Sequence, residues 1–273
     1  MNSNLATMMC VYSGDSAVHL EESIDSVLRQ SYQHHDLYLL VNGQISDEAL
    51  KLIEQYQNNN NNFFAVFSDI NMGLAKAMNH LLDKHILGKG YLYIARMDAD
   101  DVCSISRFKK QVHHLSVYSE VAVVGSDCIE IDDSGGEIGY KKMEANDIIM
   151  KNNIIIRCPF NHPSVMIRAN VFESGCRYNP ILKNTQDYYL WVDLISRGYV
   201  FSNINEALIK FRITASFYNK RGRKKAVNDF KGRFFAMKTL KIFTVKNVAF
   251  TIGIYLLRLS PIFVSKLAYK YLR

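Results

Sequence analysis

The sequence lacks closely spaced cysteine pairs. Its five cysteines are odd in number and widely separated, and no Cys-x-x-Cys pair occurs. This pattern argues against a disulfide framework and a structural zinc site, and it favours reduced, mostly buried thiols in a cytoplasmic protein. A phosphate-binding loop of the Gly-x-x-x-x-Gly-Lys type and a Ser-His-Asp order are also missing. P-loop phosphate chemistry and serine-triad hydrolysis are therefore not indicated.

Long apolar runs are missing as well. The longest one near the end, residues 248–257, has about half of the roughly 20 residues that a membrane-spanning helix needs, and Arg258 and Pro261 follow it. The first four residues lead directly into an apolar stretch, without the charged region and cleavage site of a signal peptide. We therefore expect neither a transmembrane helix nor a signal peptide.

Acidic residues are almost absent from the last quarter of the chain. Residues 210–273 hold 16 Lys and Arg but only one acidic residue, Asp229, whereas residues 1–209 carry a net charge of −8. An acidic body with a basic tail predicts an anionic partner for the tail. Charge alone leaves nucleic acid and the headgroups of an acidic membrane as alternatives.

The remaining composition is that of a globular protein. The 273 residues suit one large α/β domain or a domain with an appendage, and 48% hydrophobic with 22% charged residues excludes a disordered chain. Short β-rich runs alternate with segments of helical periodicity, which predicts a parallel sheet covered by helices. Strands are predicted at residues 5–12, 37–41, 63–67, 91–97 and 122–131. Helices are predicted near residues 20–28, 48–56, 73–82, 106–115 and 186–197.

Three carboxylates, Asp98, Asp100 and Asp101, directly follow the fourth predicted strand. Ligands bind at the carboxyl ends of strands in open α/β sheets, so the position suggests a site. Carboxylates this close repel one another, and Mg²⁺ or Mn²⁺ would offset that cost. If the backbone stays extended, Asp98 and Asp100 point to the same side and can address one ligand. A solvated acidic turn is the alternative.

Several segments together resemble the family 2 glycosyltransferases of the GT-A fold. They are residues 10–13, 20–32 and 71–75 and the acidic cluster, and the similarity continues to about Arg212. The resemblance implies an α/β, Rossmann-like fold with a mostly parallel central sheet flanked by helices. It also implies a catalytic domain at 1–212, with a donor half at 1–101 and an acceptor half at 102–212, followed by a basic amphipathic helical extension at 213–273.

The resemblance gives the acidic cluster a role in donor binding. Asp98 and Asp100 would bind the ribose and, through Mn²⁺ or Mg²⁺, the diphosphate of a UDP-sugar. Such a metal neutralises charge that develops on the leaving diphosphate. Arg96 would contact the diphosphate or simply neutralise the two aspartates.

The same resemblance predicts a nucleoside pocket lined by Val11, Tyr12 and Asn71. One segment departs from the family pattern: this chain has Asn42 where an acidic side chain commonly meets the base. An amide offers both a donor and an acceptor, so Asn42 can still pair with uracil. UDP therefore remains the expected nucleotide.

Asp187 is the candidate catalytic base. Residues 186–191 resemble the family's Glu-Asp-Tyr-x-Leu-Trp segment, whose Asp removes the acceptor proton, a task that requires hydrogen-bond reach. The alternative is a helix N-terminal carboxylate held by the helix dipole. Trp191 would form the floor of the acceptor-sugar site or pack in the core. His162 would bind metal, contact the diphosphate or make a structural hydrogen bond.

The tail alternates cations with aromatic residues, beginning with the cluster at 220–225. Basic amphipathic segments of this kind lie in the interface of anionic membranes. The alternative is a solvated basic helix that packs on the body through its apolar face, and part of residues 248–267 is expected to pack in this way. A nucleic-acid partner is not expected, because no nucleic-acid-binding module occurs.

The expected activity is inverting, metal-dependent transfer of a hexose, glucose or galactose, from a UDP-sugar to a polyprenyl-diphosphate-linked sugar. The resemblance suggests a β1,3 linkage to an N-acetylhexosamine in surface polysaccharide (O-antigen) synthesis, on the cytoplasmic, inner face of the cell membrane. Two alternatives remain. A nucleotidyltransferase would carry a Gly-rich loop with Arg or Lys, unlike residues 13–15. A non-catalytic membrane-bound sugar-nucleotide-binding protein would tolerate the loss of Asp187.

Overall fold

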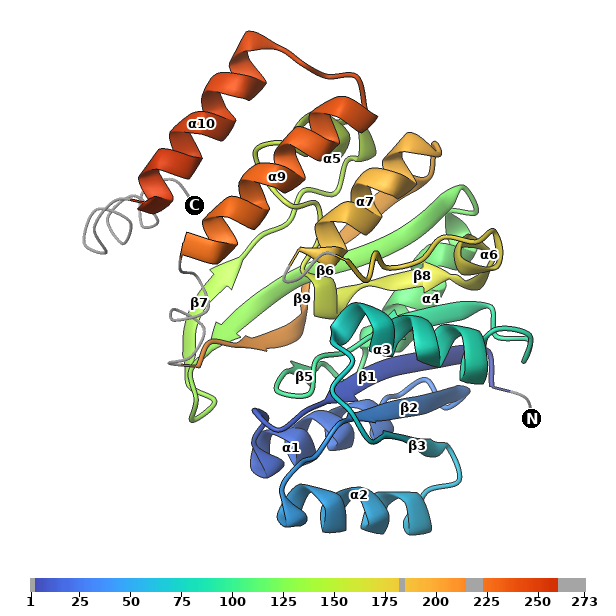
Figure 1. Cartoon of the computed structure of the whole chain (residues 1–273). Helices are drawn as coiled ribbons and strands as arrows, with labels where there is room; N and C mark the ends of the chain where they lie inside the picture. The colour runs from blue at the N-terminus through green and yellow to red at the C-terminus, as the bar shows by residue number, and fades with distance from the viewer. Residues whose placement is uncertain (1–2, 182–184, 215–222, 260–273) are drawn as a thin grey trace.

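A central sheet with helices on both faces forms the body of the protein (Figure 1). The structure, a computed structural model, describes residues 3–181, 185–214 and 223–259. Nine strands occur in these residues. They are β1 (Leu5–Val11), β2 (His35–Asn42), β3 (Phe63–Ser68), β4 (Tyr93–Arg96), β5 (Val102–Cys103), β6 (Val121–Ile131), β7 (Glu137–Lys141), β8 (Met166–Arg168) and β9 (Val200–Arg212).

The strand order explains where a ligand can bind. The strands run β3-β2-β1-β4-β8-β6-β9-β5, and β7 pairs with β6. The first four are parallel, whereas β8 is antiparallel to both β4 and β6. The expected α/β fold with a helix-flanked central sheet is confirmed, with parallel pairing confined to β3-β2-β1-β4 and to β6 with β9. The direction of the sheet changes next to the end of β4, where the acidic cluster lies.

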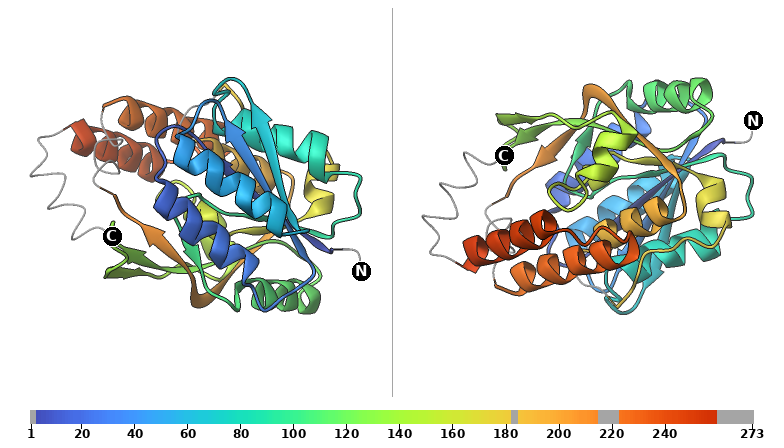
Figure 2. Two further views of the ribbon diagram at one scale, coloured as in Figure 1. Left: turned by 90° about the horizontal axis from the view of Figure 1, so that it is seen from below. Right: turned by 90° about the horizontal axis from the view of Figure 1, so that it is seen from above.

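Alternation along the buried strands builds two cores. In β1, Leu5 and Met9 face one core while Ala6 and Met8 face the other, because successive strand side chains point to opposite faces. Helices α1 (Ala17–Leu28), α2 (Asp47–Asn59) and α4 (Arg107–Val117) cover one face, and α3 (Leu74–Leu81) and α7 (Gln186–Ser196) cover the other. Figure 2 shows α1 and α2 together on their face of the sheet.

The start of helix α4 is fixed by a side chain from another segment. Ser106 precedes α4, but its side chain makes no capping hydrogen bond. The Phe108 backbone N–H instead donates to Gln30 Oε1 at 3.0 Å. Gln30, fully buried at the end of α1, also donates to the Ser104 carbonyl oxygen at 2.7 Å. The first helix therefore fixes the segment that follows the acidic cluster.

The C-terminal segment forms two further helices. Helix α9 (Arg223–Thr239) packs against α7, and α10 (Val245–Leu259) packs against α9, as the view from above in Figure 2 shows. Within the described ranges, no helix has both the length and the apolarity needed to cross a bilayer. Residues 260–273, and residues 220–222 of the basic cluster, lie outside the described residues.

A buried histidine predicts how stability depends on pH. Burial lowers the pKa of His35, whose Nδ1 bonds the Tyr32 carbonyl oxygen at 2.7 Å while its Nε2 is buried without a hydrogen-bond partner. Below pH 6.5, the usual His value, the unfolded chain therefore binds more protons than the folded one. The free energy of unfolding should rise with pH between the lowered pKa and 6.5, and urea titrations across this range measure it.

The matched variants for this prediction are His35→Asn and His34→Asn. His35→Asn removes the titrating ring. The slope of the free energy of unfolding against pH should therefore fall by up to about 1.4 kcal/mol per pH unit, which is the contribution of one bound proton. His34 lies at the surface, and its replacement should leave the slope of the wild type. Equal slopes in all three proteins would contradict the assignment. Part of the slope should persist, because burial also lowers the pKa of His114 and His162.

Candidate active site

The acidic cluster lies in a tight turn just beyond the end of β4. Asp98 to Asp101 form this turn, and the Asp101 backbone N–H faces the Asp98 carbonyl oxygen at 3.4 Å. The expectation of an extended segment with alternating side chains is therefore wrong. The turn replaces strand geometry because β4 ends at Arg96 and the chain then reverses toward β5. Asp98 and Asp100 both remain partly exposed.

Arg96 neutralises the first of these aspartates. Its guanidinium is buried, forms an ion pair with Asp98, and donates from Nη1 to the Met8 carbonyl oxygen at 3.2 Å. Its Nε has no hydrogen-bond partner, although that atom is buried. A cation held this rigidly beside a partly exposed carboxylate offsets the cost of clustered negative charge and can also face an incoming anion.

Asp101 points away from the exposed aspartates into the protein. It is fully buried, and its Oδ1 accepts a hydrogen bond from the Arg212 backbone N–H at 2.8 Å, whereas Oδ2 has no partner. Burial raises the pKa of Asp101 well above its usual value, and the charges of Asp100 and Asp98 add to this effect. Asp101 thus anchors the turn.

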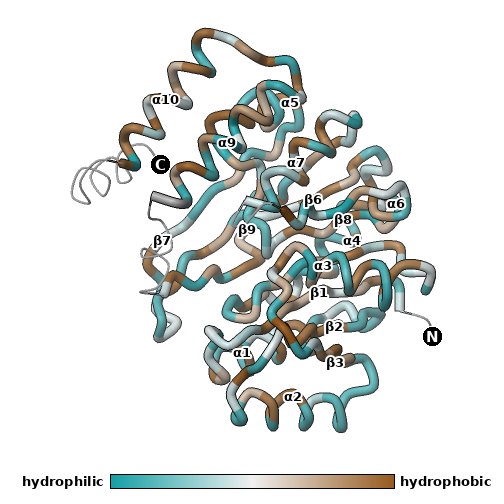
Figure 3. The backbone as a smooth tube through the Cα atoms, in the orientation of Figure 1, coloured by the Kyte–Doolittle hydropathy of each residue, from teal (hydrophilic) through white to brown (hydrophobic). Residues whose placement is uncertain are grey.

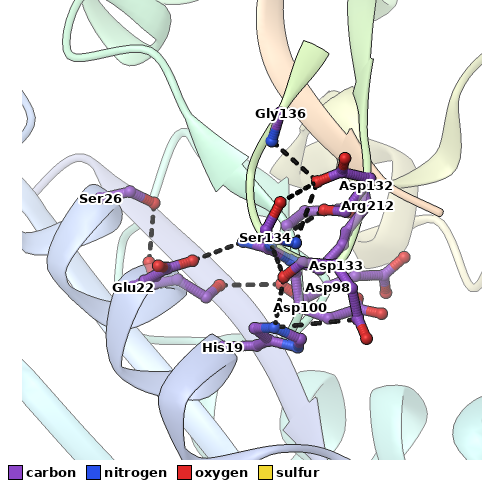
Figure 4. Close-up of polar contacts among 12 residues, drawn as sticks. His19, Glu22, Ser26, Asp98, Asp100, Asp132, Asp133, Ser134, Gly136 and Arg212 are labelled. Carbon is purple, nitrogen blue, oxygen red and sulfur yellow. Dashed lines mark hydrogen bonds and ion pairs between the residues drawn. The ribbon is translucent and has the colours of Figure 1, made fainter. Parts of the chain in front are cut away.

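Arg212, the last residue of β9, holds the acidic turn and two neighbouring segments together (Figure 4). Its Nε donates to the Asp100 carbonyl oxygen at 2.9 Å, and its Nη1 donates to the carbonyl oxygens of Asp132 and Asp133 at 3.2 and 3.0 Å. Its Nη2 pairs with the Glu22 carboxylate of α1. The side chain is only 1% exposed. The sequence interpretation treated Arg212 only as a boundary, because no local pattern links it to partners this far along the chain.

The Asn42 amide braces the Asn71 loop. Its Nδ2 donates to Asn71 Oδ1 at 3.1 Å, and its Oδ1 accepts from the Met72 backbone N–H at 2.9 Å. The next residue, Gly43, has φ of +85°, and a Cβ there would lie 2.8 Å from the Asn71 backbone nitrogen. Because the Asn42 side chain is buried and bonded internally, the structure favours loop bracing over base pairing with uracil for this residue.

The other predicted nucleoside-pocket residues follow β1 or precede α3. Asn71 is exposed, and the Tyr12 backbone N–H donates to Asp15 Oδ2 at 2.9 Å in the turn after β1. The Val11 side chain, by contrast, is buried in the core beneath α1 and α2. Only the backbone of Val11 can therefore line a nucleoside pocket.

His162 lies beside Tyr178 and Trp191. It lies in the 3₁₀ turn His162–Ser164, and its Nε2 is 3.1 Å from the hydroxyl of Tyr178. Burial and the Arg96 charge lower the pKa of His162, while the Asp187 and Asp98 charges oppose that shift. The charges of Asp98, in the first half of the chain, and Asp187, in the second half, therefore both act on this imidazole.

Asp187 occupies the first turn of α7 and is partly exposed. The helix dipole favours a carboxylate at this position. Its charge also acts on Cys158, where burial is the main cause that raises the thiol pKa to about 12. The N-terminus of α7 thus faces the surroundings of His162, Tyr178 and Cys158.

Trp191 lies one turn further along α7 and is fully buried. Its ring packs edge-on against Phe160 with centroids 4.9 Å apart, and against Phe201 and His162 at 6.3 and 6.2 Å. The structure favours the core alternative for this residue over a platform for the acceptor sugar. Trp191 supports the site by packing behind His162.

Comparisons with known proteins agree with this geometry. The amylovoran biosynthesis glycosyltransferase AmsE of Erwinia amylovora is 29% identical over 216 residues, which cover 79% of each chain. The UDP-Gal:alpha-D-GlcNAc-diphosphoundecaprenol beta-1,3-galactosyltransferase of Escherichia coli is 25% identical, over 84% of this chain and 82% of its own. The crystal structure of an S. aureus TarS fragment in complex with UDP has the same fold, with a TM-score of 0.63, 13% identity, and 98% of this chain and 83% of that chain covered.

A family model matches most of the sheet and the segments that carry the acidic turn, Asn71 and His162. It is the model described as Glycosyl transferase family 2, and it spans residues 8–173. This range is more than half of the 273 residues. The chain therefore belongs to glycosyl transferase family 2.

Proposed function

We propose that the protein is an inverting glycosyltransferase that moves a hexose from a UDP-sugar to a polyprenyl-diphosphate-linked sugar during surface polysaccharide synthesis. The observation that carries this proposal is the pair of partly exposed carboxylates, Asp98 and Asp100, beyond the end of β4 beside the buried Arg96, in a chain that belongs to glycosyl transferase family 2. A donor-binding carboxylate, Asp98, and an acceptor-activating carboxylate, Asp187, would supply the two functions that sugar transfer needs.

The donor-binding side of the site suits a divalent cation. The diphosphate of the bound donor would supply further ligands to this cation. No group of three or more potential metal-ligating side chains occurs among the described residues. Asp98 and Asp100 offer partly exposed carboxylate oxygens, the hard ligands that Mg²⁺ and Mn²⁺ prefer, and these ions commonly complete their shells with substrate phosphates and water. A metal held there with the diphosphate would neutralise charge on the leaving group.

We assign a residue to each chemical step. The acceptor hydroxyl transfers its proton to the Asp187 carboxylate as its oxygen bonds to the anomeric carbon. The bond from that carbon to the UDP oxygen breaks on the opposite side, so the configuration inverts and the bonding electrons leave with UDP. Arg96, fixed by the Met8 carbonyl oxygen, offers positive charge to the departing diphosphate, and the Asn71 loop and the turn after β1 hold the nucleoside.

The donor sugar and acceptor are proposed by analogy with the relatives. The name of the E. coli relative specifies UDP-galactose, a diphosphoundecaprenol-linked N-acetylglucosamine and a β1,3 linkage. We infer the same class of reaction here, with galactose or glucose as the transferred hexose and residues 1–212 as the catalytic unit. The basic residues beyond 212 then place the enzyme on the inner face of the cell membrane, where a polyprenyl-linked acceptor is available.

Calorimetric titration with UDP, with and without Mn²⁺, tests the donor side. Wild-type protein should bind UDP at least ~10-fold more tightly with Mn²⁺ than without, and Asp100→Ala should lose this enhancement because a metal ligand is missing. Asp133→Ala is the matched control, since that exposed carboxylate lies on the neighbouring turn outside the acidic cluster. Tight UDP binding that needed neither metal nor Asp100, or preference for GDP, would overturn the proposed donor site.

A further inference from the structure

The C-terminal helices differ in how they meet the body. Helix α9 is part of the packed structure: Ala236 and Met237 are buried against Ile154, Ile155 and Val192. Its Arg233 Nε donates to the Ile155 carbonyl oxygen at 2.8 Å. Phe235 packs on Tyr189 of α7, with ring centroids 4.5 Å apart. This part of the basic segment is therefore a docked helix and does not lie freely on any surface.

Helix α10 packs on α9 through one of its sides. Tyr255 packs on Phe230 with centroids 4.8 Å apart, Arg258 forms an ion pair with Asp229, and Thr251 is buried between the helices. These contacts orient α10 and leave its opposite side facing outward. The acidic residue of this segment, Asp229, is thereby neutralised inside the helix pair.

The outward side of α10 is apolar along its whole length. Val245, Ile252 and Leu256 are 88%, 43% and 60% exposed, and Ala249 and Leu259 are also exposed. The spacing of 245, 249, 252, 256 and 259 places them on one helical face. Figure 3 shows hydrophobic stretches along this helix at the edge of the molecule. We refer to these five residues as the α10 outer face.

Charge decides which partner this face suits. Residues 223–259 contain nine Lys and Arg and one acidic residue. Lys246 is exposed in the first turn of α10, and Lys241 is exposed in the turn between α9 and α10. A twofold dimer through the α10 outer face would bring two strongly positive segments together, which is unfavourable. An apolar stripe flanked by cations suits an anionic bilayer, because apolar burial and attraction to lipid headgroups act together.

We propose that the α10 outer face docks on the surface of an anionic membrane, with Lys241 and Lys246 at the lipid headgroups. Helix α9 then connects the bilayer contact to α7, on which Asp187 stands. The inference sharpens the proposed membrane location, but it concerns lipid contact and stands or fails independently of the transfer reaction.

Vesicle cosedimentation of the full chain tests the docking face. Wild type should bind vesicles of phosphatidylcholine with phosphatidylglycerol more tightly than vesicles of phosphatidylcholine alone. The double variant Ile252→Glu/Leu256→Glu should partition onto the anionic vesicles at least ~10-fold more weakly, because two apolar anchors become charged. The control Val117→Glu/Ile148→Glu introduces the same charges at exposed apolar positions elsewhere and should change binding less than ~2-fold.

Leu256→Gln provides a milder second variant and should give a partial loss of binding. Equal vesicle binding by wild type and the Ile252→Glu/Leu256→Glu variant would overturn the proposal, and so would equal binding of the wild type to both kinds of vesicle. A wild-type dimer that became monomeric in this variant, without a change in vesicle binding, would assign the face to a second copy of the chain instead. None of these readouts depends on donor or acceptor identity.

Discussion

Asp187→Asn should lower kcat for sugar transfer by about 10³-fold while leaving UDP affinity unchanged. General-base assistance contributes roughly 10²- to 10⁴-fold, and an amide cannot accept the acceptor proton. Asn keeps the size of the side chain at the start of α7, so the effect should be on chemistry rather than on folding. Steady-state kinetics with the preferred donor, together with UDP calorimetry, measure the two quantities separately.

Asp193→Asn is the matched control for this experiment. Asp193 lies on the same helix and pairs with Arg197 at the surface, so its loss should change kcat less than 2-fold. Exposed ion pairs contribute only ~0–1 kcal/mol to the free energy of unfolding. Full transfer by Asp187→Asn would remove the assigned base and would revive the interpretation of Asp187 as a helix-terminal carboxylate. A loss of UDP affinity equal to the loss of kcat/KM would instead place Asp187 in donor binding.

Arg212→Met should reduce both the stability and the activity of the protein. Methionine preserves much of the buried stem but removes the hydrogen bonds to the carbonyl oxygens of Asp100, Asp132 and Asp133. Hydrogen bonds from charged groups each contribute roughly 1.5–3 kcal/mol, so the free energy of unfolding should fall by about 3 kcal/mol or more. Urea unfolding measures this change.

The catalytic effect of Arg212→Met separates positioning from bulk stability. Because Arg212 fixes the Asp100 backbone, the variant should raise the donor KM at least ~10-fold and weaken Mn²⁺-dependent UDP binding even at temperatures where it is fully folded. Glu22→Gln is the control. It removes only the exposed carboxylate that pairs with Arg212, and it should lower the free energy of unfolding by less than about 1 kcal/mol. Arg212→Lys should recover part of the UDP affinity. A folded Arg212→Met variant with normal donor KM would show that the turn needs no such support.

The features that the sequence predicted correctly are local ones. The periodicity around residues 20–28 reports which face of a helix is buried, and the apolar run Leu5–Val11 indicates a strand that is buried on both faces. Each of these signals needs only neighbouring residues. The place of Asp98 after a buried strand is equally local. The roles of Asp98, Asp100 and Asp187 came from family resemblance and stay predictions.

The features that the sequence missed depend on distant partners. Arg212 contacts Asp101 and Glu22 from 111 and 190 residues away, and no pattern in the chain links such positions. The short strand β5 likewise forms only because β9 offers an edge to pair with. Propensity over two residues is too weak to indicate it.

The sequence by itself determined that this chain folds as an α/β protein with carboxylates at a strand end and a basic end segment. Burial periodicity and charge depend only on the types and order of neighbouring residues. Only the tertiary structure decided that the acidic segment is a turn held by Arg212, that Trp191 is core, and that the basic segment divides into a packed α9 and an outward apolar face on α10. These outcomes depend on which surfaces meet, and burial of one helix face leaves the other for a different partner.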